Sequence, residues 1–133
     1  MADTSHVGLI ATYFVADDAV ARGLDVGSGP GAELDGLDGG VFMPDELAAL
    51  AEHLGSSPPG YELIASTDEA WLVRLDDDLM ALVASLPESI TDELADERNL
   101  SLAEIELLEM VIRPLAGKAA ATPGNGVYEW ISL

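Results

Sequence analysis

Apolar side chains follow two different periods along this chain, and each period predicts its own kind of element. Residues 7–15 (VGLIATYFV) are β-branched and aromatic without a helical repeat, which predicts a buried strand. Residues 61–66 and 70–75 have the same character and are separated by the turn residues Thr-Asp-Glu. Residues 127–133 (VYEWISL) follow the turn sequence TPGNG and predict a last strand, which we expect to lie inside the sheet.

The stretches between these strands have helical periods and helix-start signals. The clearest signal is Ser101 with Glu104, a capping box in which each side chain satisfies a free backbone N–H group. A broad apolar stripe runs from there to Leu115, and Pro114 within it predicts a kink or a break. The expected helices cover residues 18–24, 44–54, 76–86, 89–97 and the long stretch from residue 101.

These elements predict the fold class. Strands and helices mix without a regular βαβ alternation, which indicates α+β architecture: one small mixed or antiparallel sheet covered by helices. A chain of 133 residues with 49% apolar side chains is the size and composition of one globular domain. We therefore expect a single domain over residues 1–133, with a flexible glycine-rich connector at about 25–42.

The net charge of the chain narrows the classes of molecule that it can bind. Twenty-five acidic side chains face only five basic ones, for a formal net charge of -20. Such a field repels nucleic acids and anionic membranes, and it attracts basic proteins. A high-salt or generally acidic proteome produces the same surface for solubility alone. The chain has no cysteine, which excludes disulfides and thiolate sites, and no basic leader or long apolar run, so we expect a cytoplasmic protein.

The glycine-rich stretch 27–40 invites two chemical interpretations. Residues 27–32 match the loose dinucleotide fingerprint G-x-G-x-x-A, but Pro30 removes one N–H donor and no helix begins there. The carboxylates of Glu33, Asp35 and Asp38 lack the spacing of an EF-hand, which leaves only loose calcium or magnesium binding open. A turn-rich connector is the simpler interpretation.

Other candidate chemistry has a structural explanation each time. The run 76–78 of three aspartates precedes a helix, where aspartate caps free N–H groups, although a magnesium site with a further carboxylate stays open. His6 and His53 have no metal-ligand partner four residues away. Ser28 is not in a G-x-S-x-G elbow. We assign no catalytic residue, no metal site and no cofactor.

One acidic block has a possible binding role. On a helix, like charges four residues apart repel unless a basic group lies opposite, so the block is either a solvated face or a docking patch. Ile90 and Leu94 are expected to point the other way, into the core. Three aromatic residues would anchor a partner if they are exposed. The block is Glu88, Asp92, Glu93, Asp96 and Glu97, and the anchors are Tyr61, Trp71 and Tyr128.

The order of elements resembles the YfbM-like group of small bacterial proteins. A first strand within GLIATYFVADD leads into a short helix, PDELAALAEHLG forms a middle helix, and a long helix precedes the strand GVYEWISL. The resemblance implies an α+β domain without established catalytic residues, and some relatives serve as immunity proteins beside toxins.

Three hypotheses follow for the function. The first is a non-catalytic binding protein, such as an immunity protein, antitoxin or inhibitor, that docks a basic protein such as a toxin. The second is an accessory domain whose acidity serves solubility or salt adaptation. The third is a divalent-metal enzyme that uses carboxylates, which requires at least three of them to converge in a pocket.

Overall fold

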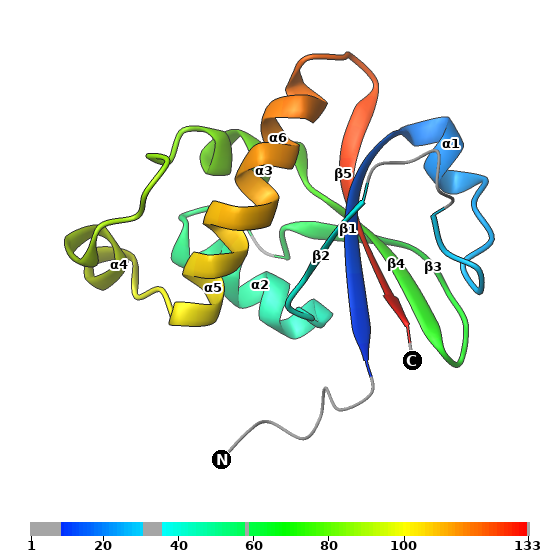
Figure 1. The fold of residues 1–133 in the computed structure, drawn as a ribbon, viewed down its shortest axis with the longest axis horizontal. Helices are drawn as coiled ribbons and strands as arrows, with labels where there is room; N and C mark the ends of the chain where they lie inside the picture. Colours follow the sequence, from blue (N-terminus) through cyan, green and yellow to red (C-terminus); the bar gives the residue numbers. More distant parts are fainter. Residues whose placement is uncertain (1–8, 31–35, 58, 133) are drawn as a thin grey trace.

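The computed structural model describes residues 9–30, 36–57 and 59–132, and it has α+β architecture, as predicted. Five strands form one antiparallel sheet in the order β2-β1-β5-β4-β3 (Figure 1). The strands are β1 (Ile10–Asp17), β2 (Gly36–Gly39), β3 (Tyr61–Ser66), β4 (Ala70–Leu75) and β5 (Asn125–Ser132).

Helices pack mainly on one face of this sheet. They are α1 (Asp18–Arg22), α2 (Pro44–His53), α3 (Asp77–Ala84), α4 (Asp92–Arg98), α5 (Leu102–Leu107), the π-helical turn η2 (Leu108–Ile112) and α6 (Arg113–Ala120). Figure 1 shows α5 and α6 as one long rod that lies beside the sheet, with α4 far from the strands. Each helix falls within a helical stretch expected from the sequence, apart from small differences at the ends.

Strand β5 lies at the centre of the sheet, as its apolar sequence predicts. It pairs with β1 along its whole length and with β4 on the other side. Val127, Glu129 and Ile131 face the main helical layer, whereas Tyr128 and Trp130 face the opposite side. Both faces of β5 are therefore covered, and its alternating side chains join two cores.

The larger core lies between the sheet and the main helical layer, where Leu47, Leu79 and Leu115 pack against the strands. The smaller core lies on the other face, where Phe14 and Tyr128 stack with ring centroids 5.5 Å apart. Helix α1 and the loop after it cover this second core. Two-sided burial gives this small sheet more apolar contact than a one-sided sheet of the same length.

The expected connector at about 25–42 is in part a strand. Residues 36–39 form β2, which pairs with β1, so this part of the interpretation is wrong. Gly29, with φ of +74°, lies against the ring of Trp130, and a Cβ there would come within 2.6 Å of the indole. The glycine thus allows close packing rather than phosphate binding. Residues 31–35, which include Glu33 and Asp35, lie outside the described residues, as does His6.

The long C-terminal helix differs from a regular α-helix where Pro114 predicts a break. Its capping box is present, with Ser101 accepting from the Glu104 N–H and Glu104 accepting from the Ser101 N–H. Before Pro114 the chain widens into η2, and α6 continues without a sharp turn. The wider turn removes the clash between the proline ring and the preceding turn, so the helix absorbs the proline without breaking. Among the described residues, no helix is both long and apolar enough to cross a bilayer.

Candidate functional site

The expected acidic block is exposed in full. We call residues 88–97 the acidic segment; its carboxylates are Glu88, Asp92, Glu93, Asp96 and Glu97, and every one of these side chains is exposed. Within the described ranges, none of the five forms an ion pair. The segment therefore presents uncompensated negative charge to solvent.

Helix α4 is held by its own caps more than by the sheet. Thr91 caps its first turn by accepting from the Leu94 N–H at 3.1 Å, and Asn99 ends it in the left-handed conformation with φ of 58°. Ile90 packs against the larger core, as expected, whereas Leu94 is only half-buried and Ala95 is the buried residue of this helix. Four of the five acidic side chains consequently lie on a short, capped helix at one end of the molecule, and Glu88 precedes it (Figure 1).

Two of the three expected aromatic anchors reach the surface only in part. Tyr61 and Trp71 are half-buried and pack against the larger core. Tyr128 is 0% exposed, because its ring stacks in the smaller core. Tyr128 therefore cannot anchor a partner. The sequence could not show which strand face is covered by α1.

Acidic side chains are also exposed far from the acidic segment. They lie on strands β2 and β3, on helices α2, α3 and α5, and in the turns between them. Examples are Asp38, Glu52, Glu62, Asp68 and Glu106. The negative charge is thus spread over the described surface, with its densest run in the acidic segment.

A groove with an apolar floor lies between β2 and the rod of α5 and η2. Its volume is about 490 Å³. Phe42, Leu107 and Val111 form buried parts of its lining, and Met110 stands beside them with 73% exposure. The remaining lining residues are Asp38, Gly39, Gly40, Ala103 and Glu106. Its lining residues include two acidic ones, Asp38 and Glu106, and no basic one.

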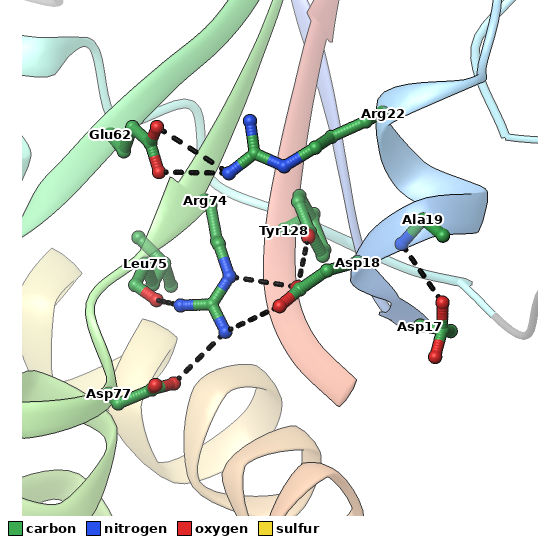
Figure 2. Close-up of polar contacts among 9 residues, drawn as sticks. All are labelled: Asp17, Asp18, Ala19, Arg22, Glu62, Arg74, Leu75, Asp77 and Tyr128. Carbon is green, nitrogen blue, oxygen red and sulfur yellow. Dashed lines mark hydrogen bonds and ion pairs between the residues drawn. The ribbon is translucent and has the colours of Figure 1, made fainter. Parts of the chain in front are cut away.

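Arg74 organises a second cluster, on the opposite side of the sheet (Figure 2). Its Nε donates to Asp18 at 2.9 Å, its Nη2 donates to Asp18 at 3.3 Å and pairs with Asp77 at 3.1 Å, and its Nη1 donates to the Leu75 carbonyl at 3.4 Å. The Tyr128 hydroxyl also donates to Asp18. The cluster joins β4, β5, the start of α1 and the start of α3, and it engages all three nitrogens of the guanidinium.

Ionisation in this cluster follows from the contacts. The hydrogen bond from Arg74, and after it the one from Tyr128, lower the pKa of Asp18. Burial, together with donation to Asp18, raises the pKa of Tyr128 to about 12. Burial opposes the charge of Arg74, but the hydrogen bond and charges of Asp18 and Asp77 outweigh it and raise the Arg74 pKa. Each of these shifts moves a pKa away from neutral pH, so we interpret the cluster as a structural joint rather than as an acid–base site.

One carboxyl group lies entirely within the protein. Glu129 is 0% exposed in the middle of β5. Its Oε2 lies 2.7 Å from the Tyr13 hydroxyl and accepts from the Phe42 N–H at 3.1 Å, whereas its Oε1 is buried without a hydrogen-bond partner among the described residues. The same Tyr13 hydroxyl lies 2.6 Å from the Gly40 carbonyl oxygen.

The hydrogens in this contact indicate a neutral Glu129. Tyr13 has a single hydroxyl hydrogen, yet its oxygen is in hydrogen-bond contact with two oxygens. If Tyr13 donates to Gly40, a protonated Glu129 supplies the hydrogen for the second contact. Burial raises the pKa of Glu129 to about 8, which agrees with this count. Tyr13 and Glu129 thus hold Gly40 and Phe42, which line the groove, through uncharged hydrogen bonds.

The histidine of α2 joins two helices. His53 Nδ1 lies 3.0 Å from Glu104 Oε2, and Glu104 also completes the capping box of α5. Glu104 is buried although it is acidic. The contact fixes the end of α2 against the start of α5.

The remaining candidates show no site. Asp76 occupies the N-cap position of α3 but makes no side-chain cap bond, and Asp77 pairs with Arg74. The expected capping hydrogen bond is therefore absent at Asp76, although the run does lie at the start of the helix. Asp25 accepts from the Gly27 N–H and the Ser28 hydroxyl, which closes a local turn. In the part of the chain that the structure describes, no group of three His, Asp or Glu side chains could hold a metal ion.

Comparisons with known proteins identify no relative: no family model, no curated protein and no solved structure matches this chain.

Proposed function

We propose that this chain is a highly acidic, non-catalytic binding protein, such as an immunity protein, an antitoxin or an inhibitor, that docks a basic protein through the acidic segment. The observation that carries the proposal is the exposure of all five carboxylates on and beside α4 without an ion pair among the described residues. Such charges steer a basic partner and raise its association rate.

Exposed carboxylates alone supply little affinity, because water and salt screen them. Anchoring contacts are needed in addition, and the half-buried Tyr61 and Trp71 are the aromatic candidates that remain. We therefore expect fast, salt-sensitive association, with the lifetime of the complex set by apolar contacts.

The alternative is an accessory domain whose acidity serves solubility or salt adaptation. The observation in its favour is the spread of exposed acids over β2, β3, α2, α3 and α5. An even charge distribution gives general repulsion between copies rather than one docking surface.

A pair of charge-matched variants separates the two functions. The first variant replaces the five carboxylates of the acidic segment with their amides. The second makes the same change at five exposed acids elsewhere: Asp45, Glu52, Asp68, Glu69 and Asp78. Both variants lose five negative charges, so they differ only in where the charge is lost.

The partner is a protein recovered at low salt from the source cell and then purified, and its affinity is measured by titration calorimetry. We expect the acidic-segment variant to lose at least about tenfold in affinity, and the control variant to lose much less. Equal losses would favour the solubility alternative. If no basic protein binds at any salt concentration, the binding function is wrong.

A further inference from the structure

We propose that the groove between β2 and the α5–η2 rod binds an extended, basic segment of the partner, which adds as a strand to the free edge of β2 and inserts apolar side chains between β2 and η2. This inference rests on the proposed function, because it takes a basic protein as the partner. It assigns the apolar contact to a surface that is separate from the acidic segment.

The lining of the groove suits apolar side chains. Its floor is apolar, since Phe42, Leu107 and Val111 line it, and the exposed Met110 can move to cover an inserted side chain. A volume of about 490 Å³ accommodates apolar side chains of a short peptide. Covering this apolar surface with side chains of the peptide removes it from water, which favours binding.

The charges around the groove complement a basic segment. Glu106 stands on the α5 side of the groove, and Asp38 on β2 accepts from the Thr12 hydroxyl on the other face of the sheet, where alternate side chains of an added strand would point; both acids are exposed. Neither pairs with a basic side chain among the described residues. An apolar segment with lysine or arginine on its alternate positions matches both features, whereas an acidic segment is repelled.

A further argument is the edge of the sheet. β2 is the last strand on its side among the described residues, so its outer N–H and C=O groups have no strand partner there. Its sequence is Gly-Leu-Asp-Gly, and the absence of side chains at Gly36 and Gly39 lets β2 pack closely on Thr12 and Tyr13 of β1. An extended peptide can form ladder hydrogen bonds with the backbone groups of this edge, while its alternate side chains reach the groove.

The floor of the groove is fixed from behind. Tyr13 lies 2.6 Å from the Gly40 carbonyl oxygen, and Glu129 accepts from the Phe42 N–H. These bonds hold the segment that follows β2 before any partner arrives. A preformed groove loses less conformational entropy on binding.

The test uses a seven-residue fluorescent peptide of alternating leucine and lysine, with binding measured by anisotropy on the full chain. Comparison peptides replace leucine by serine or lysine by glutamate. We expect the leucine–lysine peptide to bind, the serine–lysine peptide to bind at least about tenfold more weakly, and the leucine–glutamate peptide not to bind.

Two pairs of variants locate the site. Glu106→Lys in the groove is matched by Glu52→Lys on α2, an exposed acid outside both the groove and the acidic segment, and Met110→Ser is matched by Leu102→Ser, an equally exposed apolar residue outside the groove. All four positions are exposed or half-exposed on helices, so the fold should persist, and thermal melts check this. We expect about a tenfold loss of affinity for each groove variant and less than about threefold for its match.

Amide hydrogen exchange supplies the readout for strand addition. Exchange at residues 36–39 should slow when the leucine–lysine peptide binds. Unchanged exchange at β2, equal losses within each pair, or equal binding of the serine–lysine peptide would overturn the inference. If only the acidic-segment variant weakens binding of the natural partner, the proposed function stands and the groove is not its site. If only the groove variants weaken it, the groove binds the partner and the acidic segment is not the docking surface.

Discussion

At the scale of single residues, Glu129 is the unusual acid in a chain with 25 of them. Most acidic side chains keep their charge by facing water, whereas this one lies in the middle of the central strand. A buried carboxylate with an unpaired oxygen is costly, so the neutral form is favoured. The protein thus folds with one proton that the unfolded chain does not hold at neutral pH.

The first prediction is the sign of its pH dependence. The pKa of Glu129 is about 8 when folded and near 4.5 when unfolded. The stabilisation by its proton is fully present below about pH 4.5, and rising pH removes it by about pH 8, which amounts to roughly 5 kcal/mol. Glu129→Gln, which cannot ionise, should lack this loss.

The variant has one cost of its own. Glutamine cannot both donate to Tyr13 and accept from Phe42 through one atom, so we expect it to be about 1 kcal/mol less stable than the natural chain at pH 5. At pH 9 it should be the more stable of the two. Urea unfolding at both pH values measures the crossing. Parallel stability profiles would show that Glu129 is ionised in the folded protein.

At the scale of elements, the joint between α2 and α5 shows how one side chain serves two purposes. Glu104 accepts from the Ser101 N–H through one oxygen and contacts His53 through the other. The first contact starts α5, and the second fixes its start against the end of α2. Because α5 also forms one wall of the groove, the joint determines where that wall stands.

The second prediction compares variants at this joint. Ser101→Ala loses only the cap, at about 1 kcal/mol of unfolding free energy. Glu104→Ala loses the cap partner and the contact with His53 and should cost about 2 kcal/mol. Glu106→Ala, an exposed acid on the same helix, is the control and should change stability by less than about 0.5 kcal/mol. Denaturant midpoints give all three values; similar effects of Glu104→Ala and Glu106→Ala would mean that the joint contributes nothing.

At the scale of the whole molecule, the net charge of -20 opposes compaction. Only a few ion pairs offset it in the described part, namely those of Arg22 with Glu62 and of Arg74 with Asp18 and Asp77. The sheet and its two cores must therefore hold the chain together against its own field.

The third prediction concerns salt. Raising KCl from about 0.05 M to about 1 M shortens the screening length and should raise the melting temperature by several degrees. Both five-amide variants should melt higher than the natural chain at low salt and approach it at high salt. Sorbitol at matched osmolality is the control for general cosolvent effects. A melting temperature independent of KCl would show that the repulsion is already compensated.

The fold could be predicted from sequence where local signals are strong. The runs at 61–66 and 70–75 and the capping box at Ser101 identify their elements directly. Strand β2 could not be predicted, because Gly-Leu-Asp-Gly has no strand pattern and only pairing with β1 makes it a strand.

The candidate sites were less predictable for a related reason. The exposure of the acidic segment follows from its polarity. The groove and the neutral state of Glu129 do not, because Glu129 meets Tyr13 across 116 residues of sequence. One signal was present: in the last strand, Glu129 takes the alternate position shared by the apolar Val127 and Ile131. An acid on the inward period of a buried strand marks a group that needs an unusual partner.

The central position of β5 in the sheet has a consequence for folding during synthesis. Strands β1 and β4 do not pair with each other; each pairs with β5, which follows every other element in chain order. During synthesis, the hairpin of β3 and β4 and the pair of β1 and β2 emerge as separate pieces with open edges. The sheet can close only when residues 125–132 have left the ribosome, so folding should occur late and in one step. Until then, the negative charge of the nascent chain is its main protection against aggregation.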